Sequence, residues 1–529
     1  MTKSLWKILR FDEPEQEFEL LETEEGKPGF FGGAEKEQPP APPQPEPPPS
    51  ASVSENEQRL RQEYYVDINP DILLRRFMLG GNVQALTACI NGMADGSQIN
   101  DFILRQGMEA GCMDNASGSL SQHAVDHVFA QQEATLTTDW AKVKKSISEG
   151  QTAVFIDGDD KAIIMDTRGF EKRSVSTPQN EKVVRGPQEG FTESIRTNIT
   201  LLRRIIKTDD FICEFMNAGG KNNVVCVLAY RKSVINPALL KEVKTRLQNI
   251  DTHMVLNDGT LEQLTERYPL SPLPQVLNTE RPDRAAAHIM QGHVALLCEG
   301  SPSANIMPAT LFSLMATPED SYMRRPLGSV LRVVRYIGAA LSILLPGYFI
   351  AVALYHQGMM STEVISTIIA SRQMVFLPLP IEMLFLLWVF QLLREAGIRV
   401  PGSVGHAIGI IGGLILGQAA VTANIVSTVV LIIVALAGMG NFTIPDYSTQ
   451  IAGEYFRIIL VLLGWAGGLL GIAVGVVLIA AWMASLKSYG VPFLAPVVPK
   501  TYSNRPAILR GPITQQDRSS DYMNTREGK

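Results

Sequence analysis

The chain has 529 residues, 46% of them hydrophobic and 19% charged, and its formal net charge is −6 at pH 7. A single hydrophobic core rarely grows beyond about 250–300 residues, so this length predicts more than one folded unit. The acidic balance offers no basic surface to a phosphate backbone, and no base-reading motif is present, which sets a nucleic-acid-binding role aside. The five cysteines lie too far apart for a CxxC metal site or a disulfide framework, so we expect reduced, mostly buried thiols.

The N-terminal region is predicted to be an unfolded tether. Its first residues, MTKSLWKILRFDEPE, turn acidic before the apolar core of a signal peptide can form, which indicates that the soluble part of the chain stays in the cytoplasm. Residues 12–57 are rich in glutamate, and the run PPAPPQPEPPP at 39–49 is nearly all proline. Such a composition buries too little apolar surface to fold. We therefore assign residues 1–60 to a disordered, semi-extended tether.

The first soluble subdomain, residues 61–190, is predicted to combine helices with a hairpin. Apolar side chains recur at three- and four-residue spacing, which is typical of amphipathic helices, in Ile72–Leu79, Val83–Met93 and Gln98–Met108. Two short apolar strands, TAVFID and KAIIMD, then flank the sequence GDD at 158–160, which favours a tight turn. The hairpin therefore follows a helical opening.

The second soluble subdomain, residues 191–325, is predicted to be a mixed α/β layer. Residues 192–207 carry their apolar side chains on one face of a helix, and Thr192 is its expected N-cap. Strands then alternate with helices, an order that favours a sheet covered by helices. The expected strands are Val224–Tyr230, His253–Leu256, His293–Cys298 and Ala304–Met307, and the expected helices are Pro237–Ile250, Leu261–Tyr268 and Asp283–Gln291.

The third unit, residues 326–486, is predicted to be a helical membrane domain with four or five spans, followed by a cytoplasmic tail at 487–529. Segments that are apolar over about 20 residues can cross a hydrocarbon core of about 30 Å. The stretch Val404–Gly440 is too long for one straight crossing, because at about 1.5 Å per residue it would reach roughly 55 Å. The three expected spans outside this stretch are Ile337–Tyr355, Met374–Leu393 and Ile458–Trp482.

Basic residues before the first span, after the second and after the last place these regions in the cytoplasm. If all three regions lie on the same side, residues 404–440 must cross the membrane an odd number of times. This favours one full crossing within 404–440 plus a half-helix that turns back near Gly417 to Asn424. Two full crossings, which give five spans and an external tail, are the alternative. Arginines at the joint between the soluble and membrane parts either couple the two parts or anchor the chain at the cytoplasmic face, and anchoring is favoured. They are Arg324, Arg325 and Arg335.

Polar residues are costly inside a membrane and are often functional there. Asn424, Ser427 and Thr428 are predicted to share one helical face, which either lines a water path or bonds a neighbouring helix. Glu382 follows two prolines and is an ion relay, a partner for backbone donors that the prolines leave free, or a carboxylate at the membrane interface. The full set of pore-lining candidates is Glu382, Gln418, Thr422, Asn424, Ser427 and Thr428.

Glycines recur at helical spacing in the last expected span. Small residues let another helix approach closely, so we predict helix packing here, with a direct role in gating as the alternative. The residues are Gly464, Gly467, Gly468, Gly471 and Gly475.

No motif for catalysis, a cofactor or a metal ion is present in the sequence. His123 and His127 have the spacing of a zinc pair, but no accompanying glutamate and no nearby third ligand follow. The phosphate-binding loop and the GxSxG nucleophile motif are also missing. We therefore expect a protein that is not an enzyme. Its predicted fold class is α+β, with a mixed α/β soluble region of two subdomains followed by an α-helical transmembrane bundle.

Several segments, taken together, resemble the A-subunit family of bacterial spore germinant receptors (GerA type). The most specific is VVRGPQEGFTESIRTNITLLRRI at 183–205. Three more stand in the expected order at 155–175, 271–302 and 392–427, and the resemblance spans roughly residues 60–500.

This resemblance implies an integral protein of the spore inner membrane, with the soluble region on the core side. It implies a membrane B subunit and a C lipoprotein as partners, and several A subunits assembled into a nutrient-gated cation channel, with nutrient bound mainly through the B subunit. A non-conducting scaffold or signalling subunit, an accessory paralogue and a secondary transporter are the alternatives. The resemblance also implies that a loop between the soluble subdomains is a structural joint rather than a ligand contact. Its signature residues are Arg185, Gly186, Pro187, Glu189 and Gly190.

Overall fold

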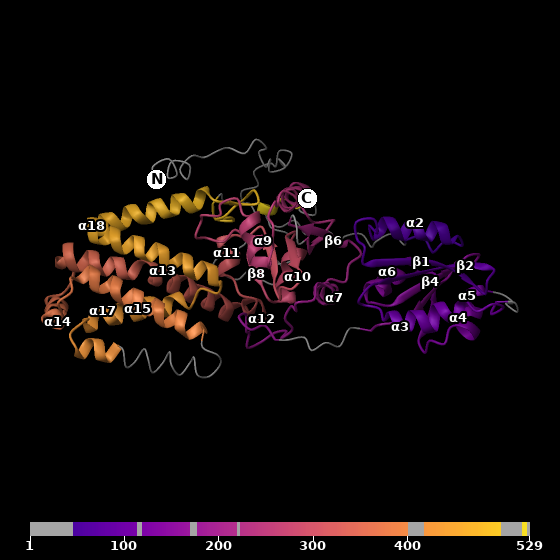
Figure 1. The fold of residues 1–529 in the computed structure, drawn as a ribbon, viewed down its shortest axis with the longest axis horizontal. Helices are drawn as coiled ribbons and strands as arrows, with labels where there is room; N and C mark the ends of the chain where they lie inside the picture. The colour runs from indigo at the N-terminus through magenta and orange to yellow at the C-terminus, as the bar shows by residue number, and fades with distance from the viewer. Residues whose placement is uncertain are drawn as a thin grey trace, which may run out of the picture.

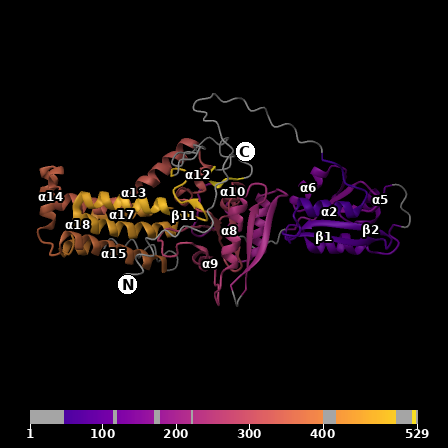
Figure 2. The same ribbon diagram turned by 90° about the horizontal axis from the view of Figure 1, so that it is seen from above.

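The computed structural model describes residues 46–113, 119–169, 177–219, 223–399, 417–498 and 521–525. A first sheet unit, a second sheet unit and a helix unit follow one another along the long axis of the molecule (Figure 1). Seen from above, the three units form a single row, with α14 at the end farthest from the sheets (Figure 2).

The first sheet unit begins earlier than the composition indicated. Helix α2 (Val53–Glu63) buries Val53 and Leu60 in the core of this unit. The backbone N–H of Val53 also bonds the carboxylate of Asp157 at 3.1 Å. The prediction of a disordered tether is therefore wrong for residues 53–60, because their apolar side chains do reach a core. Residues 1–45 of the predicted tether lie outside the described residues.

The first sheet is antiparallel, in the order β1-β2-β4-β5-β3. Helices α2 and α6 cover one face, and short helical segments cover the other (Figure 1). The strands are β1 (Ile72–Leu79), β2 (Val83–Ile90), β3 (Ala134–Thr137), β4 (Thr152–Ile156) and β5 (Ala162–Met165); the helices are α3 (Gly96–Gln98), η1 (Ile99–Leu104), α4 (Arg105–Gly107), α5 (Leu120–His123), η2 (Ala124–Val128) and α6 (Trp140–Ser148).

Two of the expected helices at the start of this unit are strands. Ile72–Leu79 and most of Val83–Met93 form the hairpin β1–β2, in which Leu79 pairs with Val83. The reversal falls on Gly80 and Gly81, whose φ angles of 62° and 82° favour glycine. The apolar residues of β2 are buried because it lies between β1 and β4, and this gives the run no clear period. The helix near 98–108 and the hairpin β4–β5 are confirmed.

The second sheet repeats the strand order of the first, as β6-β7-β9-β10-β8, and is also antiparallel. In both units two strands are followed by helices, a third strand, one helix and two last strands. The strands are β6 (Phe211–Ala218), β7 (Val224–Arg231), β8 (Leu277–Thr279), β9 (Val294–Cys298) and β10 (Ala304–Met307); the helices are α7 (Ile195–Ile205), α8 (Pro237–Gln248), α9 (Asp258–Thr265), α10 (Pro282–Met290), α11 (Leu311–Met315) and α12 (Glu319–Tyr322).

Most elements expected in this unit are confirmed, with two corrections. His253–Leu256 is a loop rather than a strand. The N-cap of α7 is Ser194, whose hydroxyl accepts from the Thr197 N–H, whereas Thr192 bonds Asn198. Strands β6 and β8 were not expected from the sequence.

Among the described residues of the helix unit, two helices are long and apolar enough to cross a membrane, α13 (Arg325–Tyr355) and α18 (Tyr447–Ser485). Between them lie η3 (Gln357–Met359), α14 (Thr362–Arg372), α15 (Leu379–Arg399) and α17 (Thr428–Asn441). After α18 the short strands β11 (Lys487–Ser488) and β12 (Val491–Pro492) return to the second sheet unit, where the Ser488 hydroxyl donates to the Gln275 carbonyl at 2.5 Å. A final turn, η5 (Asp521–Met523), also contacts that unit.

The last expected span, Ile458–Trp482, is not one straight crossing. Helix α18 is interrupted at Gly468, whose φ of 59° and ψ of −143° are non-helical. Beyond it the chain runs back along itself, so that a Cβ on Gly475 would lie 2.8 Å from a side-chain atom of Leu460. The rings of Phe456 and Trp482 meet with centroids 5.9 Å apart. Residues 447–467 and 469–485 therefore form a helical hairpin.

Candidate functional site at the junction of the sheet and helix units

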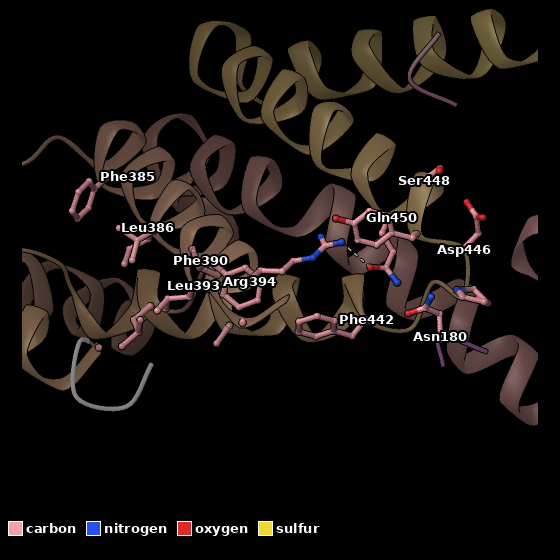
Figure 3. A pocket seen from close by; sticks show the side chains of 18 of the residues that line it. Asn180, Phe385, Leu386, Phe390, Leu393, Arg394, Phe442, Asp446, Ser448 and Gln450 are labelled. Atoms are coloured by element: carbon pink, nitrogen blue, oxygen red, sulfur yellow. Dashed lines mark hydrogen bonds between the residues drawn. The ribbon is translucent and has the colours of Figure 1, made fainter. Parts of the chain in front are cut away.

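A chamber of about 1390 Å³ lies between the second sheet unit and the helix unit. Its helix side is apolar and is formed largely by α15 and α17, with Phe385, Leu386 and Phe390 among the lining side chains. Figure 3 shows these side chains toward one end of the chamber and Asp446 and Asn180 toward the other. The chamber thus changes from apolar to polar along its length.

The sheet side of the chamber is acidic. Its carboxylates come from Glu181, Asp258, Glu262 and Glu280, and Asp446 at the start of α18 adds one from the helix unit. Most of these groups have internal partners. Asp258 accepts from the Asn278 amide at 2.7 Å, and Glu181 forms an ion pair with Arg284. The side chain of Glu262 has no hydrogen-bond partner among the described residues, and it faces the other carboxylates of this wall.

Burial is the main cause that raises the pKa of Glu262 to about 8, and the negative charges of Glu266, Asp446 and Asp258 contribute to the same shift. Proximity of like charges and loss of water both disfavour an ionised carboxylate. At pH 7 this side chain is therefore mostly neutral. The negative charge of the wall resides on its other carboxylates.

A polar network ties the helices together beside the chamber. Arg394 of α15 forms an ion pair with Glu454 and donates to Gln450 at 2.9 Å, both on α18 (Figure 3). The Asn441 amide at the end of α17 donates to Glu454 at 3.1 Å. Arg457 of α18 donates to the Ser342 carbonyl of α13 at 2.8 Å. These bonds fix the relative positions of four helices where they meet the sheet unit.

An ion-pair cluster joins α12 to the first turns of α13. The carboxylate of Asp320 is 1% exposed and pairs with Arg335 at 2.9 Å and Arg332 at 3.0 Å. Arg335 also donates to the Met315 carbonyl at 2.8 Å. Burial opposes ionisation of Asp320, but its bonds to Arg335 and Arg332 outweigh that effect and lower its pKa. Of the three arginines predicted at this joint, Arg335 thus contacts the sheet side directly, and Arg324 and Arg325 are exposed.

The predicted signature loop lies against α10 and α12. A Cβ on Gly186 would lie 2.7 Å from the ring of Tyr322, so only glycine fits there without displacement. The Pro187 carbonyl accepts from Arg281 at 2.7 Å. Glu189 pairs with Arg204 at 3.3 Å, Gly190 is buried and Arg185 is exposed. The loop therefore reaches the segment that leads into α13.

The pore-lining candidates do not lie on one helical face. Asn424 has a positive φ of 53° and sits in a turn, Ser427 is the N-cap of α17, and Thr428 is its first residue. The prediction of a shared face is wrong because the helix breaks between these positions. Gln418 and Thr422 are exposed on the helical segment before the turn, where the Thr422 hydroxyl donates to the Gln418 carbonyl at 2.8 Å.

Glu382 joins the starts of α15 and α17. One carboxylate oxygen accepts from both the backbone N–H and the hydroxyl of Ser427, each at 2.6 Å. The other oxygen lies 3.4 Å from Arg372. Glu382 therefore accepts from a backbone donor, but this donor is the Ser427 N–H at the start of α17 rather than one that the prolines leave free.

The five glycines predicted to pack helices together do so in two different ways. A Cβ on Gly464 would meet the Gly347 carbonyl of α13 at 2.7 Å, which is close packing against another helix. Gly468 provides the reversal, and Gly471 and Gly475 let the second arm of the hairpin approach the first. A Cβ on Gly467 would have no neighbour within 4 Å among the described residues.

Sequence reasoning missed the polar pairs that hold the units together. Asp71, at the start of β1, forms a buried ion pair with Arg203 of α7 at 2.5 Å, across the boundary between the two sheet units. Asn69 accepts from the Cys213 N–H of the second unit at 3.0 Å. Neither pair has a sequence signal, because the partners are far apart in the chain. Within the described residues no group of three or more His, Cys, Asp or Glu side chains could hold a metal ion.

The profile of a protein family described as "Bacillus/Clostridium GerA spore germination protein" matches residues 58–522. Spore germination protein KA of Bacillus subtilis is 32% identical over 478 residues, which cover 88% of this chain and 86% of that protein. Spore germination protein GerLA of Bacillus cereus is 33% identical over 459 residues, covering 86% and 93%. An uncharacterized membrane protein of B. subtilis, YfkQ, is 33% identical over 431 residues, covering 81% and 83%.

Among solved structures, the N-terminal domain of the A subunit of the Bacillus megaterium spore germinant receptor GerK3 aligns with 50% of this chain and 97% of its own length. The TM-score is 0.39 and the sequence identity is 24%.

Proposed function

Because this chain belongs to the GerA family of Bacillus and Clostridium spore germination proteins, we propose that it is a non-enzymatic subunit of a germinant receptor in the spore inner membrane. Its task is to convert nutrient binding into cation movement. The family match over residues 58–522 is the observation that carries this proposal. The partners are a membrane B subunit, which takes the nutrient, and a C lipoprotein, and several copies of this chain surround the ion path.

In this proposal the sheet units lie on the core side of the membrane. Helix α13 leads away from them and α15 returns, because Arg394 near the end of α15 meets Gln450 at the start of α18. Helix α17 also runs toward the sheets, since Thr443, just beyond its end, donates to the Arg335 carbonyl near the start of α13. The hairpin of α18 leads away and returns. This path leaves every strongly basic stretch on one side, as the positive-inside rule requires.

The cation path in this proposal begins at the acidic chamber. Carboxylates at the mouth of a channel concentrate cations before they enter. Signals from the partner subunits reach the helices through two contacts around α12, the Asp320–Arg335 pair and the hydrogen bond from the Tyr322 hydroxyl to Asp283. Nutrient opens the channel only to the extent that it binds the open arrangement more tightly than the closed one.

A non-conducting scaffold is the second candidate, and one observation favours it. Two ion pairs join charged side chains of the helix unit, Arg372 with Glu382 and Arg394 with Glu454. Such pairing holds helices together without requiring that ions pass between them.

Potassium release from spores separates the two candidates. Three variants are compared with the wild-type chain in spores: Asp258→Asn in the chamber, Asn424→Leu and Thr428→Leu. Glu109→Gln changes an exposed residue of the first sheet unit and is the matched control. Chain level and partner assembly are checked by blotting. The channel proposal expects slower nutrient-triggered release or altered ion preference in at least one of the first three variants, with normal assembly. Unchanged release in all of them would favour the scaffold.

A further inference from the structure

Two cysteines of the second sheet lie side by side in its core. Cys226 of β7 and Cys298 of β9 are direct partners in the antiparallel register of these strands. Both side chains belong to the same buried cluster, so they project from the same face of the sheet. Both thiols are free, and their sulfur atoms are in hydrogen-bond contact. The fold thus brings together two sulfur atoms that are far apart in the sequence.

The position of this pair in the ladder suits a covalent bond between the two sulfur atoms. One residue further along, the Glu299 N–H donates to the Val225 carbonyl at 3.1 Å. Hydrogen-bonded and non-hydrogen-bonded pairs alternate in an antiparallel ladder, so Cys226 and Cys298 form a non-hydrogen-bonded pair. The Cα atoms of such pairs are about 4.5 Å apart, within the range of about 4.4–6.8 Å that disulfides span. A disulfide therefore needs only a small movement of the two strands.

The two thiols differ in reactivity. Their contact is the main cause that lowers the pKa of the Cys298 thiol and raises the pKa of the Cys226 thiol, and burial adds to the rise at Cys226. The thiolate is the nucleophilic form of cysteine, so Cys298 is the sulfur that attacks an oxidant first. Cys226 is then the thiol that completes the bond.

Access to the pair is through the turn that follows β9. Both cysteines have an exposed fraction of 0%, so an oxidant reaches them only when this turn opens. Glu299 and Gly300 in the turn are exposed. Opening breaks the bond to Val225 and the bond from the Gly300 N–H to the Glu193 carbonyl, which measures 2.9 Å. Local opening costs less free energy than global unfolding, so a small oxidant can enter while the sheet stays folded.

We propose that Cys226 and Cys298 form a reversible disulfide when the chain meets a peroxide. The Cys298 thiolate attacks one peroxide oxygen and the O–O bond breaks. The departing hydroxide takes up the proton that Cys298 had released, which leaves a sulfenic acid and one water. The Cys226 sulfur then attacks the sulfenic sulfur, the S–S bond forms, and the hydroxyl leaves with the Cys226 proton as a second water. Two thiols thus lose two electrons to one peroxide, and excess small thiol reverses the oxidation.

The disulfide would also act on the chamber wall. The Ser301 hydroxyl bonds the Cys298 thiol and accepts from the Asp258 N–H at 3.1 Å. Asp258 lines the chamber. Movement of the Cys298 sulfur toward Cys226 loosens its bond to Ser301, so oxidation reaches the chamber through two contacts. An effect on ions rests on the proposed function, whereas formation of the disulfide does not.

Peptide mapping of the full-length chain in lipid nanodiscs tests the disulfide. The reduced chain is exposed to hydrogen peroxide, unfolded in an alkylating reagent and cut with trypsin, which places each of the five cysteines in its own peptide. Cys226→Ser removes one partner. Cys89→Ser, at a buried cysteine of β2 in the first sheet, is the matched control. Thermal unfolding midpoints verify that both variants are folded.

The proposal expects peptides 222–231 and 285–324 to be joined by a disulfide, at least tenfold more abundant than any other cysteine pair. The joined peptides should be absent in Cys226→Ser, persist in Cys89→Ser and separate again after treatment with dithiothreitol. Wild-type chain without this pair, or with several cysteine pairs in equal yield as an unfolded chain would give, would each overturn the proposal. Mass spectrometry involves no ion release, so failure here is distinguishable from failure of the channel proposal.

Discussion

Phe456 and Trp482 pack edge to face with ring centroids 5.9 Å apart within one continuous apolar segment. A straight helix would hold them about 39 Å apart at about 1.5 Å per residue. The contact therefore requires the chain to turn back, and Gly468 is where it does so. Both ends of α18 consequently lie beside the second sheet unit, where Ser488 bonds Gln275.

Substitution of Gly468 is expected to destabilise the hairpin. Its φ of 59° with ψ of −143° lies in a region that is essentially restricted to glycine, and a Cβ would stand 3.1 Å from the His356 ring. Gly468→Ala should therefore cost about 1–3 kcal/mol. The measurement is the thermal unfolding midpoint of the purified chain in detergent.

Gly467→Ala is the control for this prediction, because it changes the neighbouring glycine, where a Cβ meets no described atom within 4 Å. It should leave the midpoint unchanged or raise it slightly, since alanine favours helix over glycine by about 1 kcal/mol. Equal midpoints for the two variants would contradict a reversal at Gly468.

The reversal was not predictable from hydropathy. An apolar segment indicates that its side chains avoid water, but it does not indicate whether the chain continues straight or turns back. The glycines at helical spacing predicted close packing correctly for Gly464 against Gly347. The same spacing could not reveal which glycine adopts a positive φ, because that depends on the contact with Tyr355 and His356 made after folding.

Glu382→Gln is expected to weaken the helix unit rather than to change ion selectivity. The glutamine keeps an acceptor for Ser427 but removes the charge opposite Arg372. Loss of charge-assisted bonds of this kind costs about 1–3 kcal/mol. Unfolding midpoints and the potassium-to-sodium ratio of nutrient-triggered release are the two measurements. A changed ratio with an unchanged midpoint would restore the ion-relay interpretation.

Asp320→Asn is expected to uncouple α12 from α13. Removing one partner of a buried ion pair typically costs about 3–5 kcal/mol, and here Arg332 and Arg335 would both lose their carboxylate. Spores with this variant should show reduced chain level or delayed nutrient response. Asp67→Asn, at a largely exposed carboxylate, is the control. A normal level and a normal response in Asp320→Asn would show that the cluster does not transmit the signal.

The pH dependence of stability should depend on Glu262. Its folded pKa of about 8 lies above the ordinary value of 4.5, so the stability that it contributes is complete below about pH 4.5 and is lost as the pH rises through 8. The unfolding midpoint of the wild type should therefore fall between about pH 5 and pH 8 and then level off, by at least the few degrees that about 1 kcal/mol produces in a unit of this size. Glu262→Gln should flatten this part of the curve. An identical fall in the variant would assign the effect to other groups.

Sequence patterns predicted much of the second sheet unit, because its strands β7, β9 and β10 are short apolar runs bounded by turn residues. Strand β6, FICEFMNA, was not predicted because Glu214 and Asn217 interrupt its apolar residues. In β1 the sequence ILLRRFML fits helical and extended periods equally well, and only pairing with β2 decides between them.

The candidate sites were harder to predict than the elements. The acidic chamber collects side chains from the loop before α7, from α9 and from the start of α18. Asp71 and Arg203 are separated by 132 positions in the chain. No local sequence pattern predicts contacts between residues so far apart in the chain, because these contacts follow from the packing of whole units against one another.

Potassium flux through proteoliposomes tests the channel proposal most directly. The full chain would be reconstituted with the proposed B and C subunits, and efflux would be recorded before and after nutrient addition, with liposomes lacking this chain as the reference. The proposal predicts nutrient-triggered potassium efflux that requires this chain and decreases in Asp258→Asn. Assembled complexes that bind nutrient and show no efflux above the reference would contradict it.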